Sequence, residues 1–99
     1  MNHRAPEFVR AAADELRESA AFYEARRQGL GLRFLGAVEQ TLQHVIEEPL
    51  LGSELGGAIR RRTVDGFPFT LIYRANVVPI RVLAVAHVRR RPGYWRGRR

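Results

Sequence analysis

The sequence predicts an α+β fold in which a helical hairpin packs on one face of a small antiparallel sheet, in the order (β)ααβββ. Apolar residues recur every three or four positions up to residue 47, whereas from residue 58 the apolar segments are short and rich in β-branched residues. Glycine and proline separate these segments where turns are needed. A chain of 99 residues has the size of one domain, so we expect a single domain over 1–99 with a basic C-terminal tail over 88–99.

Two helices are predicted, over residues 11–27 and 32–47. The apolar stripe of the first helix consists of Ala12, Leu16, Ala20 and Tyr23. The stripe of the second consists of Leu35, Val38, Leu42 and Val45, supported by Phe34 and Ile46. Glycines in the connection 28–31 supply the left-handed conformation that ends the first helix, and Pro49 stops the second. Because the connection is short, the two helices should lie antiparallel.

Three strands are predicted after the helices, over 58–64, 69–74 and 77–87. The pairs Asp65-Gly66 and Ala75-Asn76 indicate the turns between them. The segment 77–87 is almost continuously apolar, which is typical of a central strand covered on both faces, and Pro79 should lie near its start. Residues 7–9 are compatible with a short edge strand. We expect Leu42 and Leu83 to be buried in the core, and Phe67, Phe69 and Tyr73 to join it with the tyrosine hydroxyl at the rim.

Charge divides the chain into two unequal parts. The formal net charge is +7, and all 17 basic residues are arginine. Residues 1–59 carry six arginines and nine acids, whereas residues 60–99 carry eleven arginines and the single acid Asp65. Such asymmetry indicates a polyanionic or acidic partner for the C-terminal part, although a solvated basic surface would give the same pattern.

Several kinds of protein are excluded or disfavoured by composition. The chain has no cysteine, so a disulfide framework and a thiolate metal site are excluded. The three histidines, His3, His44 and His87, are scattered and do not indicate a metal centre, and no cofactor motif is present. No segment approaches the length of a membrane span and the N-terminus lacks the apolar core of a signal peptide, so we expect a cytoplasmic protein.

The candidate functional side chains lie in the basic part of the chain. Arg60 and Arg62 should share one face of a strand, either an open face available to phosphates and carboxylates or an edge guarded by charge. His87 should lie on the same side of its strand as Arg81, Leu83 and Val85, either as a general base or bonded to backbone near the end of the sheet. Two interpretations are also open for the tail aromatics: Trp95 is expected to pin the tail to the sheet, and Tyr94 could pin it or contact a partner.

Four stretches of the chain together resemble the RelE/ParE superfamily of toxins from type II toxin–antitoxin systems, over about residues 8–98. The first runs from Ala13-Asp14-Glu15-Leu16 to Phe22-Tyr23-Glu24, and the second from Gly31-Leu32-Arg33-Phe34-Leu35 to Glu48-Pro49. The third is Arg60 followed by Phe67-Pro68-Phe69-Thr70-Leu71-Ile72-Tyr73. The fourth is Ala84-Val85-Ala86-His87-Val88-Arg89-Arg90 followed by Pro92-Gly93-Tyr94-Trp95. The order and spacing of the last two stretches are the most specific part of the likeness.

The resemblance implies a growth-inhibiting toxin. The His-x-Arg-Arg ending is similar to the ParE side, the plasmid-stabilisation type, which implies inhibition of DNA gyrase without nuclease activity. The alternative is a RelE-like mRNA endonuclease acting in the ribosome. Because that side usually places lysines as well as arginines on the sheet, and this chain has no lysine, the ParE interpretation is favoured.

The resemblance also implies a cognate antitoxin, whose C-terminal segment wraps the toxin. That segment should offer acids to residues 60–99 and apolar residues to a groove between the hairpin and the sheet. The candidate target- or antitoxin-binding residues are Arg60, Arg62, Arg81, His87, Arg89, Arg90 and Tyr94. No residue is assigned as catalytic on the ParE interpretation. On the nuclease interpretation, the residues that would offset phosphate charge or move protons are Arg60, Arg62, Arg74, Arg81, His87 and Tyr94.

Overall fold

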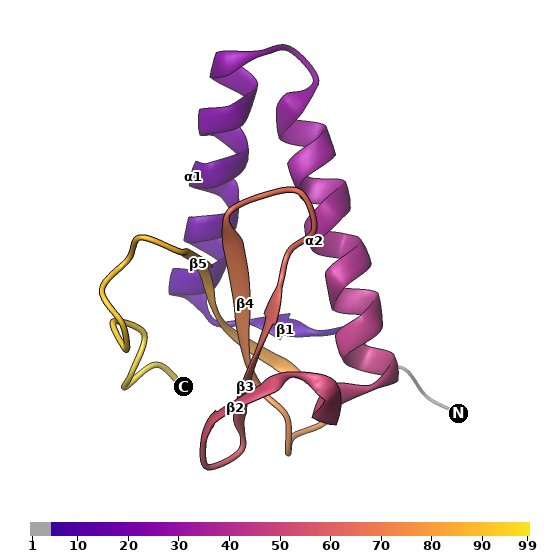
Figure 1. The fold of residues 1–99 in the computed structure, drawn as a ribbon, viewed down its shortest axis with the longest axis vertical. Coiled ribbons are helices and arrows are strands. Elements are labelled where there is room, and N and C mark those ends of the chain that lie inside the picture. Colours follow the sequence, from indigo (N-terminus) through magenta and orange to yellow (C-terminus); the bar gives the residue numbers. More distant parts are fainter. Residues whose placement is uncertain (1–4) are drawn as a thin grey trace.

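The computed structural model describes residues 5–99 and confirms the predicted α+β class, with one more strand than the sequence indicated. Strand β1 (Glu7–Phe8) precedes the hairpin of helices α1 (Arg10–Arg26) and α2 (Leu30–Glu47). A short 3-10 helix η1 (Pro49–Leu51) leads to the remaining strands, which are β2 (Ser53–Gly56), β3 (Ile59–Thr63), β4 (Phe69–Arg74) and β5 (Arg81–His87). Figure 1 shows that the loop end of the hairpin extends beyond the strands, while its other end packs against the sheet.

The sheet has five strands in the order β1-β5-β4-β3-β2. Strands β2 to β5 pair antiparallel, but β1 pairs with β5 in parallel, so the sheet is mixed rather than purely antiparallel. The sequence indicated a loop here because this edge strand is short and mostly exposed, ends in Gly56 and is followed by Gly57. The last strand begins at Arg81 rather than residue 77, and it is covered on both faces as predicted, since Val82 to Ala86 are all buried.

The hairpin turn depends on two glycines with different roles. Gly29 has a φ of 87°, the left-handed conformation expected of the connection. Gly31 instead lies inside α2, where a Cβ would stand 2.7 Å from the backbone oxygen of Ala20. The Glu24 carboxylate accepts hydrogen bonds from the backbone N–H groups of both glycines at 2.9 Å, which caps the start of α2. Because a side chain at position 31 would collide with the backbone of α1, the glycine there allows the two helices to approach closely.

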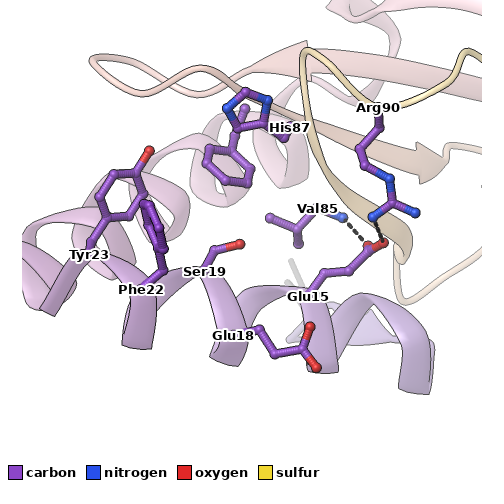
Figure 2. Close-up of a pocket in the computed structure, with 9 residues that line it drawn as sticks. Glu15, Glu18, Ser19, Phe22, Tyr23, Val85, His87 and Arg90 are labelled. Carbon is purple, nitrogen blue, oxygen red and sulfur yellow. Dashed lines mark hydrogen bonds and ion pairs between the residues drawn. The ribbon is translucent and has the colours of Figure 1, made fainter. Parts of the chain in front are cut away.

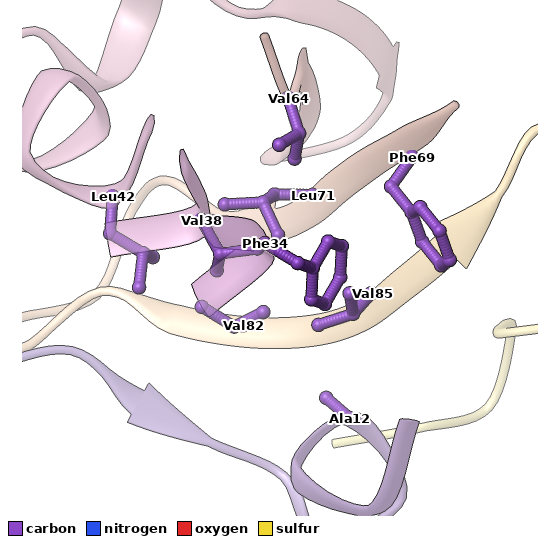
Figure 3. Close-up of a cluster of buried hydrophobic side chains, with 9 residues drawn as sticks. All are labelled: Ala12, Phe34, Val38, Leu42, Val64, Phe69, Leu71, Val82 and Val85. Atoms are coloured by element: carbon purple, nitrogen blue, oxygen red, sulfur yellow. The ribbon is translucent and has the colours of Figure 1, made fainter. Parts of the chain in front are cut away.

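The main core lies between the hairpin and the sheet. Figure 3 shows Phe34, Val38 and Leu42 of α2 facing Leu71 of β4 and Val82 of β5. The predicted stripe of α1 packs against this cluster as expected, and the predicted burial of Leu42 is confirmed. The predicted stripe of α2 is confirmed at Val38, Leu42 and Val45 but is wrong at Leu35, which is exposed, while the neighbouring Phe34 is fully buried.

A smaller apolar cluster covers the opposite face of the sheet. Cross-strand partners shift between Ile72↔Ala84 and Tyr73↔Val82, which leaves Leu83 as an extra residue in β5. Leu83 therefore faces the same side as Ala84 and packs with Trp95, not with Val85 in the main core. Its predicted burial is confirmed, but the predicted common side for Arg81, Leu83, Val85 and His87 is wrong, since this irregularity breaks the alternation.

Candidate functional site

The C-terminal tail, residues 88–99, is anchored to the rest of the molecule by side chains and runs beside β5 (Figure 1). Trp95 is 5% exposed and packs on Ile72, Leu83 and Ala84, so the prediction that it pins the tail is confirmed. Tyr94 is also an anchor, because its hydroxyl donates a hydrogen bond of 2.8 Å to Oε2 of Glu15 in α1. The tail thus has a fixed place without regular secondary structure of its own.

The Glu15 carboxylate is the centre of a network that joins α1, β5 and the tail. Arg98 donates to both of its oxygens, at 3.0 Å and 3.1 Å, and the backbone N–H of Val85 donates to Oε1 at 3.0 Å. The Arg90 guanidinium lies 3.8 Å from Oε2 and stacks on the Tyr94 ring at 3.8 Å from its centroid. Arg98 also donates to the Leu83 carbonyl oxygen at 3.0 Å.

This environment fixes the protonation of the groups around Glu15. Burial, together with the hydrogen bond to the Glu15 carboxylate, raises the pKa of the Tyr94 hydroxyl to about 12. The hydrogen bonds from Arg98 to Glu15 raise the pKa of that guanidinium above its ordinary value. Tyr94 is therefore a fixed hydrogen-bond donor near neutral pH and a poor group for moving protons.

A basic hollow lies on the face of the sheet opposite the helices, between the strands and the tail. It encloses about 240 Å³, and its floor includes Thr70 and Ile72. Four arginines line it, namely Arg61, Arg90, Arg91 and Arg96, and no aspartate or glutamate does. We call this surface the basic basin. Arg90 also lies beside the Glu15 carboxylate, but no acid stands near the other three arginines in the lining, so the basin should attract anionic groups of a partner.

A second hollow, of about 340 Å³, lies between α1 and the ends of β4 and β5. We call it the α1 groove. Figure 2 shows Phe22, Tyr23 and Val85 around it, with His87 and Arg90 on the strand side and the carboxylates of Glu15 and Glu18 on the helix side. Phe22 remains 54% exposed although it is a large aromatic residue. The groove therefore offers apolar surface with charged groups at its margin.

His87 lies between the two hollows and lines both. Its ring packs edge-on against Phe69, and its Nδ1 accepts a hydrogen bond of 3.0 Å from the backbone N–H of Arg89. With Nδ1 an acceptor, the proton of the neutral ring lies on Nε2. This bond agrees with the expectation of a histidine bonded to backbone near the end of the sheet.

Arg60 and Arg62 share a face as predicted, but it is the helix-covered face. Their cross-strand partners are Tyr73 and Leu71, whose side chains pack in the cores on the helix side. The expected open face is therefore wrong for this pair, and the expected charged edge is also wrong because β2 covers β3. Arg61, on the other side of β3, faces the basin.

Arg60 is engaged in the fold rather than free for a ligand. Its guanidinium donates to the carbonyl oxygens of Leu50 and Gly52, at 3.0 Å and 2.9 Å. The Tyr73 hydroxyl nearby donates to the Pro49 carbonyl oxygen at 2.6 Å, and burial raises the pKa of Tyr73. These bonds hold η1 against the sheet and give Arg60 a structural role.

The six side chains of the nuclease interpretation do not come together. Arg74 and Arg81 pair across β4 and β5 at one end of the sheet, where Arg81 also lies 3.2 Å from Glu7. His87 is at the other end of β5, roughly 20 Å away along a strand of this length. Tyr94 is bound to Glu15, and Arg60 to η1. A shared phosphate could therefore not meet all of these groups at once.

The sequence reasoning missed Glu15, Arg61, Arg98 and Phe22 as members of a site. Only Glu15 gave a signal, a weak one, because its carboxylate lies beside the apolar stripe of α1. Its bond to Arg98 spans 83 positions, which no local pattern can indicate. His44 is exposed on α2, and His3 lies outside the described residues.

Within residues 5–99, no cluster of three or more histidine or acidic side chains could hold a metal ion. None of the helices described is both long and apolar enough to cross a membrane.

Comparison with known proteins now gives the family. The family model described as ParE toxin of type II toxin-antitoxin system, parDE, matches residues 7–92. A chain of the chromosomal ParDE TA system from P. aeruginosa has the same fold, with a TM-score of 0.69 and 17% sequence identity, over 86% of this chain and 96% of that one. No curated protein matches the sequence. With a family match over most of its length and the fold to accompany it, the chain belongs to the ParE toxins of type II toxin–antitoxin systems.

Proposed function

We propose that this ParE toxin stops growth by binding DNA gyrase through the basic basin, without cutting nucleic acid. The observation that carries the proposal is the basin itself, a hollow lined by four arginines and no acid. A macromolecule that contacts its target through such a surface needs complementary charge and shape, and no proton transfer. The choice of gyrase as the target follows from the resemblance to ParE.

The arrangement of the remaining candidates supports binding over cleavage. Ribonuclease chemistry needs a proton acceptor and a donor about 3 Å from the reacting oxygens, beside cations that stabilise the phosphate. His87 uses Nδ1 as an acceptor for backbone, and Tyr94 is held by Glu15. Arg89 and Arg90 remain exposed near the basin and are retained as target-binding candidates, whereas Arg60 is not.

We expect cells that make this toxin without antitoxin to stop dividing, elongate and induce a DNA-damage response, while their mRNA stays intact at early times. Changing His87 to Gln should leave toxicity largely unchanged, because no proton transfer is needed. Changing Arg61 and Arg96 together to Gln should weaken it, because these cations form the basin. The measurements are growth after induction, transcript integrity, and inhibition of supercoiling by purified gyrase.

The control for this experiment is the double change of Arg26 and Arg27 to Gln, which removes the same charge from the end of α1, outside the basin. Early ribosome-dependent cleavage of transcripts that disappears in the His87→Gln variant would contradict the proposal and favour the RelE-like mRNA endonuclease. Toxicity that falls equally in both double variants would show that only net charge matters.

The α1 groove is the proposed binding site of the antitoxin. It combines apolar surface from Phe22, Tyr23 and Phe69 with Arg90, whose side chain stays 52% exposed on the strand side although it lies beside Glu15. It therefore fits a segment that carries an apolar anchor, with a carboxylate on the strand side, away from Glu18. This agrees with the groove expected between the hairpin and the sheet. Neutralisation would follow because the antitoxin would also cover Arg90, which lines the basin as well.

Phe22→Ala should weaken binding of the cognate antitoxin by roughly tenfold or more, since exposed aromatic residues that fill a groove act as anchors. Leu32→Ala is a matched control, because Leu32 is 73% exposed but lies near the start of α2 and does not line the groove. Isothermal titration with purified antitoxin measures both. Equal losses of affinity in the two variants, or no loss of affinity in Phe22→Ala, would contradict the binding of the antitoxin in the groove.

A further inference from the structure

The strand β5 has an edge that only partly pairs with another strand. On that side β1 pairs with Arg81 and Val82, and the last bond of this kind runs from the Val9 N–H to the Val82 carbonyl oxygen at 3.0 Å. Beyond it, the Leu83 carbonyl and the Val85 N–H would need a partner, because buried backbone groups left without hydrogen bonds are costly. Side chains supply that partner here: Arg98 donates to the Leu83 carbonyl, and Glu15 accepts from Val85.

The Glu15 carboxylate is saturated by these interactions. Oε1 accepts from the Val85 N–H and from Arg98, and Oε2 accepts from the Tyr94 hydroxyl and from Arg98. Glu15 is 12% exposed at its side chain, and α1 holds its backbone rigidly. A two-pronged bond between a guanidinium and a mostly buried carboxylate is among the stronger and more directional contacts in proteins. We call the bonds of Glu15 to Tyr94 and Arg98 the clasp.

The clasp bears on the basin because the tail supplies three of its four arginines. Arg90, Arg91 and Arg96 belong to a segment of turns, in which Gly93 and Gly97 have positive φ angles of 76° and 92°. Turns of this kind do not fix the path of a chain over ten residues. The path therefore depends on the anchors Tyr94, Trp95 and Arg98, and two of these three anchors are bound by Glu15.

We propose that Glu15 is the positioning residue of the basic basin: its carboxylate closes the edge of β5 and holds the tail so that the arginines face the partner. This inference rests on the proposed role of the basin in toxicity. Glu15 itself does not contact the target; it acts by holding the arginines of the tail in place. Loss of its charge should release the tail while α1 and the sheet stay folded. The reason is that the main core joins the helices to the sheet and contains no residue of the tail.

The test uses the full-length toxin with Glu15→Gln, which keeps the shape of the side chain and removes its charge. Arg98→Gln breaks the clasp from the tail side and leaves α1 unchanged, so it serves if Glu15→Gln fails to fold. Glu39→Gln is the matched control, because Glu39 is an exposed acid of α2 that lines neither hollow and makes no bond to the tail among the described residues.

Trp95 is the only tryptophan of the chain, so its fluorescence reports the tail directly. We expect acrylamide to quench it several-fold more strongly in Glu15→Gln and Arg98→Gln than in Glu39→Gln. The Val85 amide should also exchange its hydrogen roughly tenfold faster or more in the clasp variants, because a charge-assisted hydrogen bond is lost. Circular dichroism should show the helices retained. The dose of inducer that stops growth should rise in both clasp variants and not in the control.

Growth arrest is measured without reference to gyrase, so the inference can fail separately from the proposed target. Unchanged quenching in both clasp variants would show that Glu15 does not hold the tail. Increased quenching with unchanged toxicity would show that a held tail is not needed, which overturns the positioning role. If the wild-type toxin arrests growth without inhibiting gyrase, the proposed target is wrong. The role of Glu15 is then still decided by the toxicity and quenching of the clasp variants.

Discussion

Replacing Phe34 by Ala is expected to lower the free energy of unfolding by about 3–5 kcal/mol, the range for a buried aromatic residue cut to a methyl group. The Phe34 ring is fully buried and lies 4.9 Å from the Phe69 ring and 5.2 Å from those of Tyr23 and Phe67, measured between centroids. It therefore links both helices to the sheet. The loss is a large part of the 5–15 kcal/mol that typically stabilises a small domain.

Thermal unfolding measures this effect, and a fall of at least about 12 °C is expected for a domain of this size. Phe22→Ala is the control, because it removes the same ring from an exposed position of the neighbouring helix and should change stability by less than about 1 kcal/mol. If Phe34→Ala melts with the parent protein, the phase of α2 in the main core is incorrect.

Leu83→Ala is expected to cost about 2–5 kcal/mol, with an additional effect on the tail. Leu83 is fully buried on the side of the sheet opposite the helices, where it packs with Trp95. A cavity there removes part of the surface on which the indole ring rests. The variant should therefore unfold at a lower denaturant concentration and, while still folded, show stronger quenching of Trp95.

The comparison for Leu83→Ala is Val82→Ala, one residue earlier in β5. Val82 is equally buried but packs in the main core, so its truncation should destabilise the protein without exposing Trp95. Equal quenching in the two folded variants would contradict the assignment of Leu83 to the tail-covered face, and with it the irregular register of β5.

The sequence was informative where the physical cause is local. The period of the apolar residues located both helices to within two residues at each end, and the turn residues located β3 and β4. The stripe of α2 was predicted correctly except at its start, where Leu35 was chosen as a core residue. Phe34 and Leu35 are adjacent and both apolar, so spacing alone could not decide which one faces the core. Strand β2 carries no apolar alternation, since it is an edge strand with little to bury.

The candidate site was less accessible, because it depends on contacts between distant parts of the chain. Alternation predicted that Arg60 and Arg62 share a face and Arg61 takes the other, but only the pairing with Tyr73 and Leu71 shows which face the helices cover. The extra residue at Leu83 moved His87 relative to Arg81, and no local signal announces such an irregularity. In the sequence, Glu15 cannot be distinguished from an ordinary exposed acid of a helix, so its contacts with the tail could not be predicted.

The closed edge of β5 also limits how copies of this chain can associate with one another. An edge strand with free N–H and C=O groups is a template on which another molecule can add a strand, and aggregation often begins there. Among the described residues, the sheet ends in β1, a strand of two residues, and β2, a strand of four residues whose pairing is irregular after Glu54. On the longest strand, β5, the Leu83 carbonyl and the Val85 N–H, which lie beyond β1, are occupied by Arg98 and Glu15. A released tail would therefore open an apolar strand to intermolecular pairing.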